Sequence, residues 1–271
     1  MCQSQGHGCA RLAIRLDKEP SSLSLLRNDH SKLASNEWTL LSNCLHTFDE
    51  QNVPIKIQYC INEFSSLPPK LRMKPSEVAN LIRALYSGVG AMVEQSPDFY
   101  SLSGDTRQVL TKHNLYISGV MNSFFLSREL NIFDNLSVLN VCNHMYGSEY
   151  VLKLRGNVAR YDSNGSLIKI LIFILTFSSN ISIVQYDNEE HISIMSNSIN
   201  LVRIQNIYVT MLWKYLVYLY GFNEAVLRFT SLVKNVLDLL SFLNSVPEDE
   251  ARQRMMNKIV TETERTLVIT D

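Results

Sequence analysis

One apolar stripe limits how this chain can fold more than any other feature of its sequence. Between Ser76 and Val93, apolar residues recur three or four positions apart over about five turns of helix. The stripe consists of Val78, Leu81, Ile82, Leu85, Tyr86, Val89, Met92 and Val93. This spacing predicts a long helix with one buried face. Pro97 ends the helix because proline disfavours the helical conformation at Ser96.

A second long helix is predicted directly afterwards. Ser103 is a suitable N-cap residue, and the carboxylate of Asp105 complements the positive end of the helix. From Leu115 onward the segment is apolar on nearly every side, and it includes Ile117, Val120, Met121, Phe124, Phe125 and Leu126. A helix with that profile enters the molecule from the surface and ends buried, so we expect it to be central.

Composition extends the helical interpretation to the whole chain. Only ten glycines and seven prolines interrupt 271 residues, and 46% of the residues are apolar, which is enough for a large core. We therefore predict an all-α fold. Residues 147–166 are the exception, because they alternate apolar and polar residues and reach a turn signal at Asn164-Gly165. That pattern predicts a small β-hairpin.

The chain divides into three expected parts. Residues 1–35 mix serine, asparagine and charged residues with short apolar runs, which predicts a loosely ordered leader. Residues 36–247 carry the helical periodicity and form the expected domain. Residues 248–271 follow Pro247 as a charged C-terminal tail.

Several functional classes have no support in the sequence. The net charge is −1, so no basic surface is expected that would hold nucleic acid directly. The five cysteines are scattered, and no metalloprotease, hydrolase or nucleotide-binding motif occurs. Apolar stretches at 167–177 and 207–222 are too short to span a bilayer. We therefore expect no catalytic residue, no metal, no cofactor and no membrane insertion.

The break between the two long helices resembles the signature of nuclear-receptor ligand-binding domains. In that family, Phe-Ala-Lys-x-Ile-Pro-Gly-Phe ends the third helix and Asp-Gln-x-x-Leu-Leu-Lys opens the fourth. The matching residues here are Met92, Val93, Pro97, Phe99, Asp105, Val109 and Leu110. The similarity covers residues 36–245, whereas no set of cysteines corresponds to the family's DNA-binding zinc module.

The resemblance implies a three-layer antiparallel helical sandwich that encloses an apolar pocket for a small lipid or steroid-like ligand. The pocket candidates are Ile82, Leu85, Tyr86, Val89 and Met92 from the first long helix, with Met121, Phe124 and Phe125 from the second. The resemblance also implies a nuclear domain that regulates transcription through protein contacts, as a homo- or heterodimer formed through residues 225–240. Two alternatives stay open. Either the bulky side chains fill the space themselves, or the chain is a helical protein-interaction scaffold of another family without a ligand pocket.

The family's coregulator groove is matched only in part. The candidate groove residues are Val93, Glu94, Val109, Leu110, Lys112 and Glu262. Glu94 stands where the family has a lysine that caps the end of a coactivator helix, so its charge has the opposite sign. In the degenerate activation helix at 259–264, Thr263 and Glu264 replace the second apolar pair. We therefore expect leucine-rich coregulator peptides to bind weakly.

Overall fold

The structure is a computed structural model that describes residues 32–50, 53–178 and 199–244, together with Arg254, Asn257, Lys258, Thr261 and Glu262. Every regular element in this part of the chain is a helix, so the predicted all-α class is confirmed. The predicted leader lies almost entirely outside the described residues, and so does most of the predicted tail. Within the described ranges, no helix has the length and apolar character needed to cross a membrane.

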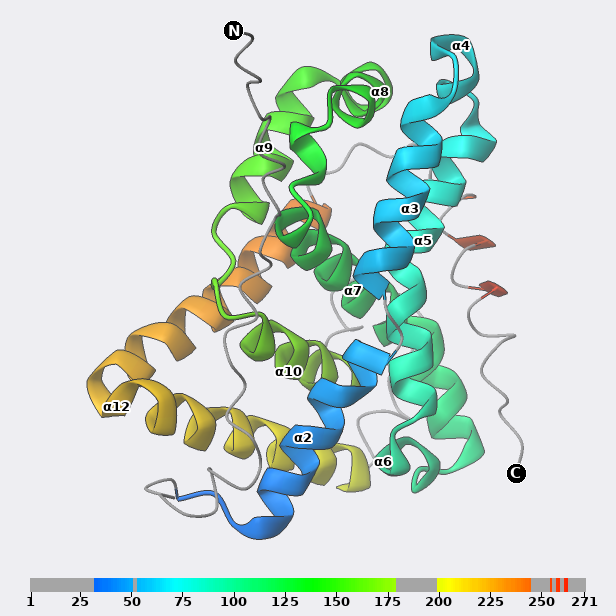
Figure 1. The fold of residues 1–271 in the computed structure, drawn as a ribbon. Helices are drawn as coiled ribbons and strands as arrows, with labels where there is room; N and C mark the ends of the chain where they lie inside the picture. The colour runs from blue at the N-terminus through cyan, green and yellow to red at the C-terminus, as the bar shows by residue number, and fades with distance from the viewer. Residues whose placement is uncertain are drawn as a thin grey trace, which may run out of the picture.

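Figure 1 labels the helices along the chain. They are α2 (Ser35–Glu50), α3 (Val53–Ser66), α4 (Pro69–Arg72), α5 (Pro75–Glu94), α6 (Pro97–Tyr100), α7 (Gly104–Glu129), the 3-10 turn η1 (Ile132–Asp134), α8 (Leu136–Tyr146), α9 (Ser148–Val158), α10 (Gly165–Thr176) and α12 (Ile199–Asn244).

The two predicted long helices are confirmed. Helix α5 covers the apolar stripe and ends at Glu94, just before Pro97. Helix α7 begins after Ser103, whose hydroxyl accepts a hydrogen bond from the Thr106 amide at 3.4 Å. Between them, Pro97 opens the short helix α6, because the fixed φ of proline suits a first helical position.

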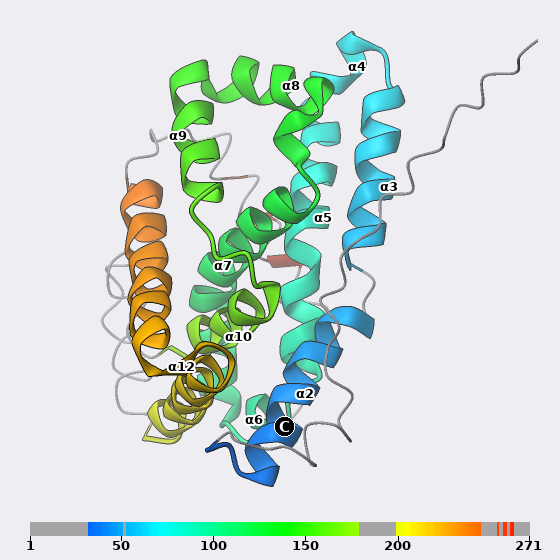
Figure 2. The same cartoon turned by 60° about the vertical axis from the view of Figure 1, so that its left-hand side comes forward.

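Helix α7 lies at the centre of the fold. It packs against α5, α9, α10 and η1, and Figures 1 and 2 show it in dark green between these elements. The side chains of Leu110, Ile117 and Met121 are fully buried. Contact on several sides explains why the sequence is apolar nearly all round from Leu115 onward.

Helices α5 and α7 approach each other closely. A side-chain carbon at Gly119 would lie 2.3 Å from the ring of Tyr86, so glycine is required for this ring to pack against α7. The Asn122 side chain of α7 donates a hydrogen bond to the Leu85 carbonyl oxygen of α5 at 2.9 Å. These two contacts fix which face of α5 is turned toward α7.

The predicted β-hairpin over residues 147–166 is wrong. Helix α9 occupies Ser148–Val158, and the described residues contain no strand. Val151 and Val158 are buried at helical spacing, so packing against α7 and α12 overrides a short alternating pattern. The turn signal at Asn164 is instead a helix N-cap, whose side chain accepts a hydrogen bond from the Ser166 amide at 3.1 Å.

Helix α12 changes direction at a glycine within its length. Gly221 has φ 74° and ψ 169°, a conformation that residues with a side chain rarely adopt. It separates a first arm, residues 199–220, from a second arm, residues 222–244. Figure 1 shows the two arms, in yellow and orange, meeting at a corner. Through its two arms α12 contacts both α10 and α9.

Candidate functional site

An apolar cavity of about 170 Å³ lies between α5, α7, α8, α9, η1 and the end of the second arm of α12. Its walls bring together residues that are far apart in the sequence, from Phe64 to Leu243. A second hollow, of about 740 Å³, lies between the start of α2 and the first arm of α12, but it opens widely to solvent. The smaller cavity is the less open of the two and has walls from several packed helices, so it is the better candidate for a ligand site.

Four of the eight predicted pocket residues line this cavity. They are Ile82, Leu85, Tyr86 and Phe124. The other four, Val89, Met92, Met121 and Phe125, are buried in the packed core and do not line it. Phe125 packs near Gly165, where an added side-chain carbon would lie 3.2 Å from its ring.

The walls that α8 and α9 supply were not predicted. Val138, Val141 and Cys142 of α8 line the cavity, with Tyr150 and Leu154 of α9. The helical spacing of Val151, Leu154 and Val158 is the signal that could have identified α9 as a helix. No local signal shows that the side of this helix with Tyr150 and Leu154 reaches a cavity.

The cavity is lined by apolar and aromatic groups. Phe242, from the end of α12, contacts Phe124 with ring centroids 5.7 Å apart and Tyr150 with centroids 4.9 Å apart. Among the described residues that line it, none is charged. The hydroxyl of Ser123 in this wall donates to the Val120 carbonyl oxygen at 2.8 Å. Burial raises the pKa of the Cys142 thiol to about 11, so this thiol is neutral at physiological pH.

The signature residues lie at the corner between α5 and α7. Phe99 is only 1% exposed, and Pro97 and Asp105 are exposed on either side of it. The adjacent Asp98 accepts a hydrogen bond of 2.7 Å from the phenol of Tyr208. Burial raises the pKa of this phenol well above its ordinary value, so the hydroxyl keeps its proton and acts as the donor.

The predicted groove residues do not form a continuous exposed surface. Val93, Val109 and Leu110 are buried, whereas Glu94 is exposed. The side chain of Lys112 lies outside the described part of the structure.

Glu262 lies away from Glu94. It accepts a hydrogen bond from Nε of Arg83 at 2.7 Å. Arg83 and Glu94 are eleven residues apart on α5, which corresponds to about 16 Å along the helix. The structure therefore does not bring the two acidic groove candidates together.

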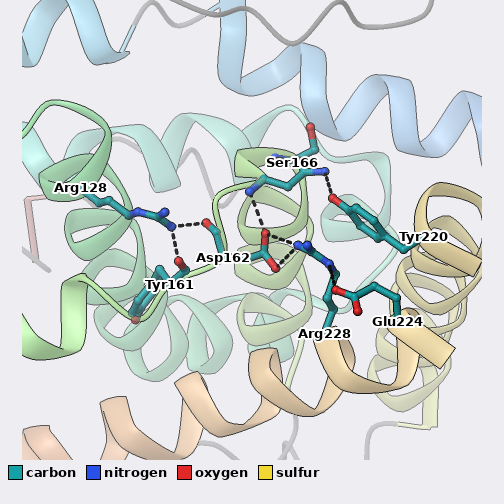
Figure 3. Close-up of polar contacts among 8 residues, drawn as sticks. Arg128, Tyr161, Asp162, Ser166, Tyr220, Glu224 and Arg228 are labelled. Atoms are coloured by element: carbon teal, nitrogen blue, oxygen red, sulfur yellow. Dashed lines mark hydrogen bonds and ion pairs between the residues drawn. The ribbon is translucent and has the colours of Figure 1, made fainter.

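A polar cluster joins the α9–α10 loop to α7 and to both arms of α12 (Figure 3). The Asp162 carboxylate accepts hydrogen bonds from Nη1 of Arg228 at 2.9 and 3.1 Å. Arg128 of α7 donates to the carbonyl oxygens of Tyr161 and Asp162. The Arg228 guanidinium also lies 4.0 Å from the ring centroid of Tyr220. Because Arg128 is engaged in this loop, it does not line the cavity.

The helices and the cavity define an all-α domain with a small, mainly apolar site between its helices. A scan against models of protein families finds no match for this chain, and a search of curated proteins finds none either. In the described ranges, no group of three His, Cys, Asp or Glu side chains is arranged to hold a metal ion. A functional proposal for this protein therefore depends on its signature residues and its geometry.

Proposed function

We propose that this chain is a diverged nuclear-receptor-type ligand-binding domain that regulates transcription in the nucleus through contacts with other proteins. The observation that carries the proposal is the burial of Phe99 at the corner between α5 and α7. The family has a phenylalanine at this corner. Val93, Val109 and Leu110, which match apolar positions of the same signature, are also buried. A sequence match whose apolar positions all lie in the core supports a shared architecture.

The proposed architecture is the three-layer antiparallel sandwich of that family. In this arrangement α2, α3 and α5 form one outer layer, and α7 and α10 belong to the middle layer. The second arm of α12 lies with α9 in the other outer layer. Four contacts support this order: α7 packs against α5 and against α9, α10 packs against α2, and α12 packs against α9.

The second arm of α12 supplies the proposed partner surface. Val226, Leu227, Val233 and Leu237 are between 40% and 66% exposed along this helix. Neighbouring charges are already paired along the helix, with Arg228 to Glu224 at 2.9 Å and Lys234 to Asp238 at 2.6 Å. The remaining surface is therefore suited to apolar contact with a second helix, as in a homo- or heterodimer.

Coregulator peptides are not the expected partners. Glu94 presents a negative charge at the end of α5, where the carbonyl ends of a docked helix would be repelled. The three apolar groove candidates are covered in this structure. Regulation through the α12 surface is therefore the preferred mode. A helical interaction scaffold without a ligand is the second candidate, and the same exposed surface supports it.

A reporter assay tests the regulatory proposal. The chain is fused to a heterologous DNA-binding domain, and transcription from a reporter gene is compared with that of the DNA-binding domain alone. We expect a several-fold change that is lost in the double variant Leu227→Asp and Leu237→Asp, because the charges disrupt the apolar surface. Leu152→Asp is the matched control, because Leu152 is an equally exposed leucine on α9.

The outcomes separate the two candidates. A reporter response that depends on the α12 surface supports the receptor-type domain. Self-association through α12 without any reporter response supports the scaffold instead. An equal response of the double variant and the control would refute the proposed partner surface.

A further inference from the structure

We propose that the cavity between α5, α7, α8 and α9 binds a small neutral molecule with a single aromatic ring. The binding itself is inferred from the size, polarity and shape of the cavity. Only the idea that the ligand regulates transcription rests on the proposed function.

The size of the cavity sets the first limit. Its volume of about 170 Å³ is below the range of roughly 300–1,000 Å³ that holds drug-sized or steroid-like ligands. It is close to the roughly 150 Å³ of engineered apolar cavities that bind benzene. The wall at Tyr86 cannot move toward α7, because its ring already fills the space beside Gly119. One aromatic ring therefore fits, and a fused four-ring skeleton does not.

The polarity of the walls sets the second limit. No charged side chain from the described residues lines the cavity, so a carboxylate or an ammonium group would enter without an ionic partner. Two arginines that adjoin lining residues in the sequence are engaged elsewhere. Arg83, which lies between the lining residues Ile82 and Leu85, pairs with Glu262 at 2.7 Å. Arg128 donates to the carbonyl oxygens of the α9–α10 loop. The walls therefore favour a neutral ligand over a fatty acid or another ionised lipid.

The shape of the aromatic wall favours a ring over an alkyl chain. Phe124 and Phe242 meet edge to face, with an interplanar angle of 69°. Tyr150 extends the cluster from α9 at an angle of 37° to Phe242, and Tyr146 continues it on α8. A ligand ring can add to this cluster in the offset and edge-on geometries that aromatic groups prefer.

Fluorine NMR on the full chain tests the proposal with two matched probes. Fluorobenzene is neutral, and 4-fluorobenzoate carries the same ring with a carboxylate. We expect a saturable shift or broadening of the fluorobenzene signal and no change for 4-fluorobenzoate. Saturation at a hundredfold excess over Kd is also expected to raise the melting temperature by about 5 to 10 °C.

Filling the cavity provides the control for location. Val138→Phe adds a ring at a fully buried wall position of α8, and Cys142→Phe adds one at a less buried position of the same wall. Both variants are expected to abolish fluorobenzene binding. Asn140→Phe adds the same ring to an exposed position of α8 and is expected to leave binding unchanged. Circular dichroism identifies which variants keep the helical fold.

Three results would overturn the proposal. They are the absence of fluorobenzene binding, equal binding of both probes, and fluorobenzene binding that survives in a folded cavity-filled variant. None of these results affects the reporter assay, so a domain that regulates transcription without binding the probe would retain the proposed function. Probe binding without a reporter response would instead support the ligand site and refute the receptor-type function.

Discussion

The Tyr208 hydroxyl donates a hydrogen bond of 2.7 Å to the Asp98 carboxylate, and this contact ties the first arm of α12 to the corner that carries Phe99. The ring of Tyr208 stacks with Phe173 and with Phe177 of the α10 region, at centroid distances of 5.4 and 5.6 Å. The corner between α5 and α7 is therefore held from outside by helices that come much later in the chain.

Removing this hydroxyl is expected to weaken the corner. Tyr208→Phe keeps the stacked ring but leaves the Asp98 carboxylate without its donor, which should lower the free energy of unfolding by about 1.5–3 kcal/mol. Urea denaturation measures the change. Tyr218→Phe, at a less buried site on the same arm, is the control and should change stability by less than about 0.5 kcal/mol. Equal effects at the two sites would show that the hydrogen bond to Asp98 has no special role.

A methyl group at Gly119 is expected to force α5 and α7 apart. Gly119→Ala would place a carbon 2.3 Å from the Tyr86 ring, so we expect a loss of about 1–3 kcal/mol from overpacking. Gly156→Ala on α9 is the matched control. No atom lies within 4 Å of the added carbon there, and the helix should gain up to about 1 kcal/mol. Chemical denaturation compares the two, and opposite signs are the expected result.

The Asp162–Arg228 pair should contribute more to stability than an ion pair on the surface. The Asp162 side chain is 8% exposed, and its removal leaves the Arg228 guanidinium without a partner in the α9–α10 loop. Asp162→Ala is therefore expected to cost about 1–3 kcal/mol. Glu149→Ala breaks the solvent-exposed pair with Lys153 and should cost at most about 0.5 kcal/mol. Thermal unfolding of both variants checks the difference, and similar losses would contradict it.

The reactivity of Cys142 is expected to depend steeply on pH. Burial raises the pKa of its thiol to about 11, compared with about 8.5 for an ordinary cysteine. Because the thiolate is the reactive form, iodoacetamide should modify Cys142 slowly at pH 8 and faster as the pH approaches 11. Peptide mass spectrometry of native and urea-unfolded chains measures this rate. Equal rates at pH 8 would show that the thiol is not buried.

The same shift has a consequence for stability. The folded state favours the neutral thiol, so its contribution is complete below the pKa of the unfolded chain and is lost as the pH rises toward 11. Alkaline destabilisation should therefore be smaller in Cys142→Ala than in the native chain, when each is compared with its own stability at pH 7.

The sequence by itself determined the long helices and their ends. The bounds of α5 and the start of α7 follow from an extended apolar period, from Pro97 and from the Ser103 cap. The break at Gly221 follows from the residue that accepts a positive φ. These signals are local, because each depends on residues within a few positions of one another.

Only the tertiary structure decided the nature of α9 and the extent of the cavity. In α9 a short pattern suited either a strand or a helix, and packing against α7 and α12 selected the helix. Periodicity also identified which face of α5 is buried, but Ile82 faces the cavity whereas Met92 faces solid core. Whether a buried side chain meets other atoms or an empty space depends on how separate helices cross. That crossing is fixed by distant contacts, such as Tyr86 on Gly119, which no local stretch of sequence encodes.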